Sequence, residues 1–295
     1  MAQNVTQLSA LSRLFSSSVF HEMANKGCSP LFARLFAQTG LLTSRVDLGT
    51  VGEAFDAAFA VLRSSGLRDE YVYRAALTHN ILLGRHSLKT SSMLTEFRIG
   101  SSKADLVILN GTGTVYEIKS DRDSLKRLDN QLANYSKVFA KIYVIAGERH
   151  LQEVICRTAS NIGVMSLGAR GQITTVREAI DCPDSVCPVT VFDSLRLIEA
   201  SAILHALGES VPKVPNTILH AAMRECFSRL EPAEVHHHMV KVLKKTRSLE
   251  AVGGLIDKLP AALQPAALSI KVRRSDHERI LDAVQTPLSD AMAWA

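Results

Sequence analysis

Two short strands joined by a tight turn can be read from residues 104–119, ADLVILNGTGTVYEIK. The first strand is an apolar run interrupted only by Asp105, which is typical of a strand that is covered on both faces. Asparagine and glycine at 110–113 favour a hairpin turn. In the second strand, alternation places Glu117 and Lys119 on the same face. Because a buried carboxylate is costly unless it is paired or binds a cation, Asp105 is a candidate for one of these roles.

The chain around this hairpin predicts a central mixed sheet flanked by helices. Further strands are expected where residues alternate or form short apolar runs, at 95–99, 141–146, 164–167 and 174–176. Apolar residues at helical spacing predict a helix over 125–139, with Asp121 or Asp123 as its N-cap. Three strands, a helix and another strand in this order indicate an α/β core.

The regions on either side of the sheet have helical patterns. Up to about residue 88, apolar residues recur at steps of three and four, and Asp69 can cap a helix that Gly84 ends. From Phe192 onward a second helical pattern is interrupted by prolines. We therefore expect an N-terminal helical region, an α/β core and a C-terminal helical region at 1–65, 66–190 and 191–295.

The composition is that of an ordinary globular protein, with 46% hydrophobic and 21% charged residues in a chain of 295. This excludes a disordered, a collagen-like and a disulfide-stapled protein. No stretch approaches the roughly 18 uncharged apolar residues of a membrane helix. The N-terminus lacks the pattern of a secretory signal, and five scattered cysteines fit reduced thiols. We expect a cytoplasmic protein with no membrane partner.

The chain is basic, with a net charge of +5 and a pI near 9.0. This charge permits a nucleic-acid partner. The middle of the chain is close to neutral between basic flanks, as a metal site that acts on a polyanion would require. The alternative, a charge that is merely spread over a solvated surface, fits the counts equally well.

Asp105, Glu117 and Lys119 together supply the parts of a metal-dependent phosphodiesterase site. Two carboxylates can hold Mg²⁺ through oxygen ligands. An ammonium group can position or activate the attacking water and stabilise negative charge in the transition state. The alternative is that Glu-x-Lys is only the wet face of an amphipathic strand. The site is favoured because a helix with Gln131 and Tyr135, neighbours on its surface, follows directly.

These motifs resemble the PD-(D/E)xK nuclease superfamily, and closely its bacterial and phage-borne sce7726 family. The match is carried by Glu96, 103–106, 116–121, 123–128, Gln131, Tyr135, 138–139 and 143–145. The resemblance implies a restriction-endonuclease-like core, in which Asp105, Glu117 and Lys119 match the signature Asp, Glu and Lys. Gln131 and Tyr135 match the Gln-x-x-x-Tyr element of RecB-like nucleases. The proline of the signature is absent from this chain.

The resemblance implies a nuclease that uses Mg²⁺ or Mn²⁺ and acts on DNA. The expected metal ligands are Asp105, Glu117 and Glu96, with Glu70 of the first core helix in reserve. Lys119 is expected to activate or position water, with Gln131 and Tyr135 within its reach. The alternative is a catalytically silent module of the same fold that binds nucleic acid or protein. In that case the helical flanks would serve a protein partner or a homo-oligomer.

Exposed cations are expected to contact the phosphate backbone. The candidates are Arg98, Lys126, Arg127, Lys244 and Lys245. The three consecutive histidines at 236–238 are not expected to chelate a metal, because neighbouring helical residues diverge by about 100°. We expect them on the surface of a helix.

Overall fold

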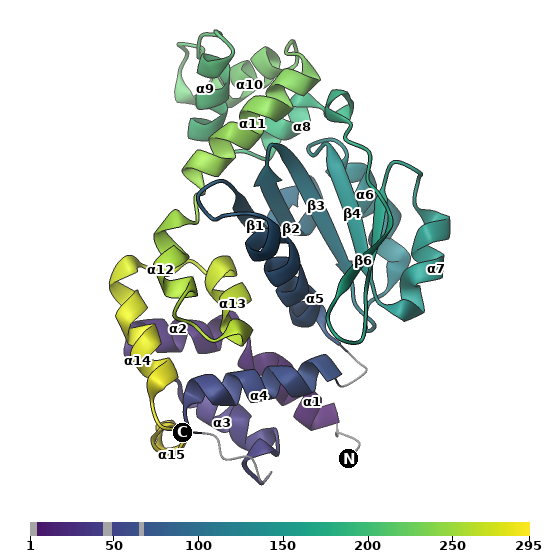
Figure 1. The fold of residues 1–295 in the computed structure, drawn as a ribbon. Coiled ribbons are helices and arrows are strands. Elements are labelled where there is room, and N and C mark those ends of the chain that lie inside the picture. Colours follow the sequence, from purple (N-terminus) through teal and green to yellow (C-terminus); the bar gives the residue numbers. More distant parts are fainter. Residues whose placement is uncertain (1–4, 44–48, 65–67) are drawn as a thin grey trace.

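The computed structural model describes residues 5–43, 49–64 and 68–295, and its centre is a six-stranded mixed sheet (Figure 1). The strands are β1 (Ser92–Ile99), β2 (Ser102–Asn110), β3 (Thr112–Lys119), β4 (Lys141–Ala146), β5 (Gly163–Leu167) and β6 (Ile173–Arg177). They lie in chain order across the sheet. The pairs β3–β4 and β4–β5 are parallel, and the other three pairs are antiparallel. The predicted α/β class, mixed sheet and strands are confirmed.

Two glycines make the tight turns between the first three strands. Gly100 links β1 to β2 with a φ of 56°, and Gly111 links β2 to β3 with a φ of 74°. Glycine adopts this left-handed conformation without the steric cost that a Cβ would bring. The predicted hairpin turn at 110–113 is therefore confirmed, and its shortness keeps β2 and β3 in a fixed register.

Helices from both ends of the chain form a group below the sheet (Figure 1). They are α1 (Val5–Leu14), α2 (Ser17–Lys26), α3 (Pro30–Gln38), α4 (Val51–Ser64), α5 (Glu70–Leu77), α12 (Gly253–Ile256), α13 (Gln264–Ser269), α14 (His277–Gln285) and α15 (Leu288–Ala291). The group packs on one face of the sheet mainly through α5, which contacts β3, and α13, which contacts β1. As predicted, the Asp69 side chain caps α5 by accepting from the Val72 N–H. A π-helical turn at Thr78–Leu83 extends α5, and the predicted Gly84 is its C-cap.

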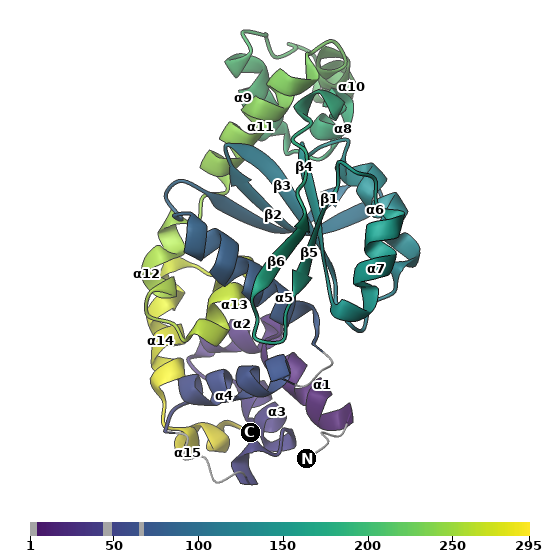
Figure 2. The same ribbon diagram turned by 45° about the vertical axis from the view of Figure 1, so that its right-hand side comes forward.

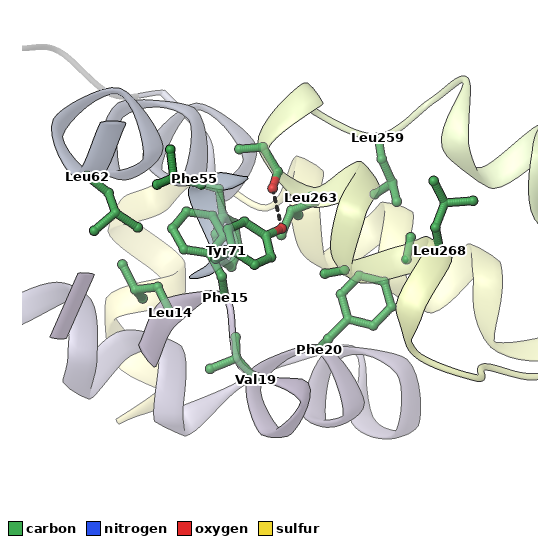
Figure 3. Packing of buried hydrophobic residues seen from close by; sticks show 14 of the residues in the cluster. Leu14, Phe15, Val19, Phe20, Phe55, Leu62, Tyr71, Leu259, Leu263 and Leu268 are labelled. Atoms are coloured by element: carbon green, nitrogen blue, oxygen red, sulfur yellow. Dashed lines mark hydrogen bonds between the residues drawn. The ribbon is translucent and has the colours of Figure 1, made fainter. Parts of the chain in front are cut away.

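The first and last helices share one hydrophobic core, part of which is seen in Figure 3. The ring of Phe15 stacks on that of Tyr71 at a centroid distance of 4.6 Å. The Tyr71 hydroxyl donates to the carbonyl of Ala262 at 2.6 Å, across 191 positions of the chain. In the same way Arg279 Nε donates to the carbonyl of Ala24, 255 positions earlier. The two ends of the chain therefore form a single helical layer, the lower part of Figures 1 and 2.

The helices from the middle of the chain are α6 (Leu128–Tyr135), α7 (Glu148–Arg157), α8 (Pro188–Asp193), α9 (Leu197–Ala206), α10 (Asn216–Phe227) and α11 (Pro232–Thr246). Of these, α6, α7 and α11 pack on the other face of the sheet, and α8, α9 and α10 gather around α11 beyond the end of the sheet (Figure 1). Short 3-10 turns lie at Leu41–Thr43, Leu125–Arg127, Pro183–Ser185, Glu250–Val252, Ala261–Leu263, Arg274–Asp276 and Met292–Trp294. A second hydrophobic core fills this side of the sheet. None of the described helices has the length and apolar character needed to cross a membrane.

Two details of the predicted helix over 125–139 were wrong. Its first turn is a 3-10 turn that is capped by Ser124, whose hydroxyl accepts from the Lys126 N–H. Asp123 instead accepts from the Ser120 N–H and closes the preceding loop. The α-helix ends at Tyr135, because the chain then turns toward β4. The helix α7 between β4 and β5 was not predicted.

The prediction of a surface position was wrong for His236. Its side chain is 3% exposed, and its Nε2 accepts from the Ala140 N–H at 3.3 Å. Burial lowers the pKa of His236 to about 4, so that the ring is neutral and can accept this hydrogen bond. His237 is exposed and His238 is half-buried. The first histidine therefore anchors α11 to the end of the sheet.

A fully buried glutamate joins α9 to the end of α11. Glu199 accepts two hydrogen bonds of 2.8 Å from the guanidinium of Arg247 and one of 3.1 Å from the Thr246 hydroxyl. It also caps its own helix by accepting from the Arg196 N–H at 2.9 Å. Burial alone would raise the pKa of Glu199, but these hydrogen bonds and the charge of Arg247 outweigh it and lower the pKa.

Candidate active site

The strands β2 and β3 separate next to Asp105. Their last backbone pair on this side is Leu106 with Tyr116. Beyond it, Asp105 Oδ2 accepts from the Ile118 N–H at 2.8 Å, so a side chain takes the place of a backbone partner. On β1, Glu96 stands opposite Asp105 with a φ of 57°. This conformation is uncommon for a residue other than glycine and turns Glu96 out of the regular strand pattern.

Three carboxylates from three elements converge at this point. Oxygens of Glu70 on α5, Glu96 on β1 and Asp105 on β2 all lie within 4.8 Å of one another. Two of these carboxylates also form ion pairs, Glu70 with Arg74 and Glu96 with Lys103. Both ion pairs are partly exposed, so each contributes little to stability. Their carboxylates remain available to a cation.

A chain of hydrogen bonds links β3 to α6 beside this cluster. Lys119 Nζ donates to Glu117 Oε1 at 2.7 Å and to Gln131 Oε1 at 2.9 Å. The Tyr135 hydroxyl lies 2.8 Å from Glu117 Oε2 and 2.9 Å from the carbonyl oxygen of Lys103. Gln131 Nε2 donates to the same hydroxyl at 3.4 Å. Because Glu117 and Lys119 are 1% and 5% exposed, this network is shielded from water.

Burial and mutual repulsion change the acidity of the two inner carboxyl groups. Burial, and then the charge of Glu117, raise the pKa of Asp105 to about 8. Burial likewise raises the pKa of Glu117, although Lys119 opposes the shift. Burial and the neighbouring Glu117 raise the pKa of Tyr135, which keeps its hydroxyl protonated. A nearby divalent cation would favour the ionised form of both carboxyl groups.

Two hollows open on either side of Asp105. A pocket of about 360 Å³ is lined by Glu70, Asp105, Glu117, Ile118, Lys119, Asp123, Ser124, Lys126, Arg127 and Gln131. A second, of about 410 Å³, is lined by Arg98, Gly100, Ser101, Ser102, Lys103, Asp105, Arg127, Asn130 and Gln131. All five predicted catalytic residues except Tyr135 line one or both pockets. Tyr135 is fully buried behind Glu117.

The cluster of convergent oxygens differs from the predicted ligand set in one member. It contains Asp105 and Glu96 as expected, together with the reserve carboxylate Glu70. Glu117 lines the same pocket but directs its oxygens to Lys119 and Tyr135. Its role as a ligand stays a prediction.

The predicted contacts to nucleic acid fall into two groups. Arg98, Lys126 and Arg127 are exposed and line the pockets. Lys244 and Lys245 lie in the last turn of α11 and are absent from the lining of both pockets. As contacts, these two stay a prediction for nucleic acid that extends beyond the pockets.

Several polar residues of the site had no role in the sequence analysis. Lys103 pairs with Glu96 and offers its carbonyl to Tyr135. Asn134 donates to the Ser102 hydroxyl at 2.8 Å and so ties α6 to the β1–β2 turn. The spacing of Lys103 two positions before Asp105, on the same strand, was the available signal for its place here.

Comparisons with known proteins point to a phage family. The family model for bacteriophage P4 protein cII matches residues 63–252. Protein cII of Enterobacteria phage P4 is 39% identical over 87 residues, which are 30% of this chain and 32% of that protein. The matched segment thus spans about a third of the length of this curated relative. Among solved structures, the chain is similar to the SPO1766 protein of unknown function from Silicibacter pomeroyi, with a TM-score of 0.28 and 17% identity over 41% of this chain and 85% of that one.

Proposed function

The chain belongs to the bacteriophage P4 protein cII family, and we propose that it is a metal-dependent nuclease that hydrolyses the phosphodiester bonds of DNA. The observation that carries this proposal is the position of Asp105. It lies between two other carboxylates on one side and the Glu117–Lys119 pair on the other. The phage family supports a phage or bacterial setting, where the substrate would be met in the cytoplasm.

The acidic residues fit a divalent cation, Mg²⁺ or Mn²⁺. Opposite ligands of Mg²⁺ are about 4.2 Å apart, because each lies at about 2.1 Å from the ion. The oxygens of Glu70, Glu96 and Asp105 are within 4.8 Å of one another. Glu70, Glu96 and Asp105 would hold the ion through hard oxygen ligands, which are the ones such ions prefer. Glu117 is the proposed further ligand.

Each protein group has a distinct task in the proposed hydrolysis. When bound, a divalent cation acidifies the attacking water and neutralises charge on the phosphate. Lys119 has three N–H donors, of which Glu117 and Gln131 take two. The third has no acceptor among the described residues and is proposed to hold the attacking water or a phosphate oxygen, which would stabilise charge in the transition state. Tyr135 holds Glu117 from behind, and Gln131 holds Lys119.

The fold surrounds this chemistry in the way proposed for a restriction-endonuclease-like core of the PD-(D/E)xK type. A mixed sheet carries Asp105, Glu117 and Lys119 on adjacent strands, and α6 supplies Gln131 and Tyr135. The residue ranges proposed for the core and its flanks are 66–190, 1–65 and 191–295. Members of the helical flanks are the proposed surface for a protein partner or a second copy.

A panel of substrates tests the proposed function directly. Plasmid, linear duplex, single-stranded DNA and RNA are each incubated with the protein and Mg²⁺, Mn²⁺ or a chelator. We expect metal-dependent cleavage of DNA. A parallel thermal-shift experiment should show a higher Tm with Mg²⁺ for the wild type and no such shift for Asp105→Ala. Glu153→Ala, a carboxylate exposed on α7, is the matched control and should keep the shift.

Two outcomes would contradict the proposed nuclease function. The first is cleavage that survives unchanged in Asp105→Ala, which would indicate a contaminating enzyme. The second is tight binding of nucleic acid with no cleavage under any metal condition, which would replace the nuclease with a silent binding module of the same fold.

A further inference from the structure

The two hollows beside the carboxylates adjoin each other. Asp105, Arg127 and Gln131 line both of them. A polyanion whose phosphate reaches Asp105 would therefore have its neighbouring phosphates in the hollows on either side. Which form of nucleic acid fits depends on what those hollows offer.

Three cations at the hollows have no ion-pair partner among the described residues. Arg98 lies on β1, and Lys126 and Arg127 lie in the 3-10 turn before α6; all three are exposed. By contrast, Lys103 and Lys119 at the same site are each paired with a glutamate. The three unpaired cations are free to replace the counterions of a phosphate backbone.

The remaining lining suits phosphate and sugar and does not suit bases. Apart from Ile118 and Gly100, every lining residue carries a charge, a hydroxyl or an amide. The uncharged polar members are Ser101, Ser102, Ser124, Asn130 and Gln131. Hydroxyls and amides are common partners of phosphate oxygens. Proteins that bind unstacked bases usually hold them on aromatic rings, and no aromatic side chain lines either hollow.

Aromatic side chains are also missing from the rest of the surface. The chain has 10 Phe, 5 Tyr and 1 Trp, and all of them lie within the described residues. None of these rings is exposed. Phe59 and Trp294 are half-buried and pack against other rings of the lower helical layer, and all the others are buried. Proteins that bind single strands gain about 1–3 kcal/mol for each base stacked on an aromatic ring. No Phe, Tyr or Trp ring of the chain is exposed for that purpose, and no histidine lines either hollow.

We propose that the nucleic acid bound at this site is a duplex, held through its phosphate backbone by Arg98, Arg127 and Lys126. In a duplex the bases are already stacked on one another, and the backbone is the surface that remains to be contacted. The substrate class rests on the proposed nuclease function for its cleavage, but binding can be tested without cleavage.

The test measures binding in the presence of a chelator, so that no strand is cut. Fluorescence anisotropy compares a labelled DNA duplex of about 20 base pairs with a poly-dT strand of the same length over a range of salt concentrations. We expect the duplex to bind at least about tenfold more tightly. Three phosphate contacts predict that log K falls with log salt at a slope of about −2.7.

Two triple variants locate the contact. Arg98→Ala/Lys126→Ala/Arg127→Ala removes the three cations of the hollows. Arg13→Ala/Lys26→Ala/Arg34→Ala removes three exposed cations from α1, α2 and α3 and is the matched control for net charge. We expect the first variant to weaken duplex binding about tenfold or more. The slope of log K against log salt should become shallower by the amount expected for the loss of about two to three phosphate contacts. The control should bind within about twofold of the wild type, with circular dichroism confirming both folds.

The outcomes separate this inference from the proposed function. Poly-dT that binds as tightly as the duplex or more tightly would overturn the proposal that the site binds a duplex. Equal losses of duplex affinity in the two triple variants would do the same. Metal-dependent cleavage restricted to single strands would do the same while leaving the nuclease intact. Duplex binding through the three cations without any cleavage would support the inference and contradict the nuclease.

Discussion

Glu117 at the separated strands and Glu199 under α11 are both almost completely buried, yet the protein treats them in opposite ways. Glu199 is held by a planar guanidinium, a hydroxyl and a backbone N–H, and its pKa is lowered. Glu117 is held by a lysine and a tyrosine beside another carboxylate, and its pKa is raised. The first arrangement satisfies a charge permanently. The second leaves a negative site incompletely compensated, as a site that waits for a cation should be.

The largest expected effect is on cleavage. Lys119→Ala should slow DNA hydrolysis by about 10³-fold or more, because the ammonium serves the transition state. Binding of DNA in chelator should change by less than about threefold, since the lysine contributes little to ground-state binding. Lys137→Ala, an exposed lysine just beyond α6, is the control and should cleave like the wild type. Similar losses in both variants would remove Lys119 from the proposed machinery.

The next largest effect is on stability. Glu199→Gln should lower the free energy of unfolding by about 3–5 kcal/mol, because it leaves Arg247 partly buried without its counter-charge. Glu117→Gln should cost less, at most about 1 kcal/mol, because burial raises the pKa of Glu117 and disfavours its charge, and because Lys119 keeps both Gln131 and the nearby charge of Asp105. Urea denaturation measures both. Equal destabilisation would mean that the two glutamates are structural to the same degree.

Glu199 should also give the wild type an acid-sensitive component of stability. Its folded pKa is lowered, so its contribution is present above the ordinary value of 4.5 and is lost as the pH falls through the folded value. The loss of stability between about pH 5 and pH 3 should therefore be shallower in Glu199→Gln. Unfolding curves of the two proteins at several pH values measure it, and parallel pH profiles would contradict the assignment.

Asp105 should behave in the opposite sense in protein free of divalent cations. Its pKa is raised from 3.8 to about 8, so its favourable contribution is complete below the unfolded pKa and is lost as the pH rises toward 8. Asp105→Asn cannot ionise and should be more stable than the wild type by about 1–2 kcal/mol at pH 8, with a smaller difference at pH 5. Added Mg²⁺ should stabilise the wild type alone. A destabilised Asp105→Asn at pH 8 would show that this carboxylate is already compensated.

The smallest effect is expected from the lysines of α11. Charge reversal in Lys244→Glu/Lys245→Glu should weaken DNA binding by less than about threefold and leave the cleavage rate at saturation unchanged. The same reversal in Lys126→Glu/Arg127→Glu, at the hollows, should weaken it about tenfold or more. A larger loss in the α11 variant would place its lysines on the main path of the DNA.

The strands, and the face of the sheet on which each side chain lies, were predictable because hydrophobic alternation and glycine turns are local signals. Residues 104–119 alone gave two strands, their turn at Gly111 and the shared face of Glu117 and Lys119. The helix α7 was missed although Leu151, Val154 and Ile155 stand at helical spacing; the stripe is only three residues long and only Val154 is fully buried. His236 was misplaced because its burial depends on Ala140, which is distant in sequence.

The residues of the site were predictable, but which of their carboxylates converge was not. Asp105, Glu117 and Lys119 were found from spacing, and the resemblance added Gln131 and Tyr135. The position of Glu70 beside Asp105 depends on how α5 packs on the sheet, and no local pattern encodes that. The left-handed conformation of Glu96 is equally tertiary in origin, because its sequence reads as an ordinary strand residue.

The hydrogen bond from Arg279 to Ala24 has a consequence for the synthesis of the chain on the ribosome. The helices that are made first must wait for partners 255 residues further on. At about 5–20 residues per second this wait lasts roughly 10–50 s, during which the part of their apolar surface that packs on α13 and α14 stays uncovered. The sheet and the helices of residues 188–246 emerge before those partners and can pack without them. The layer that contains the first helices made is therefore the last to close.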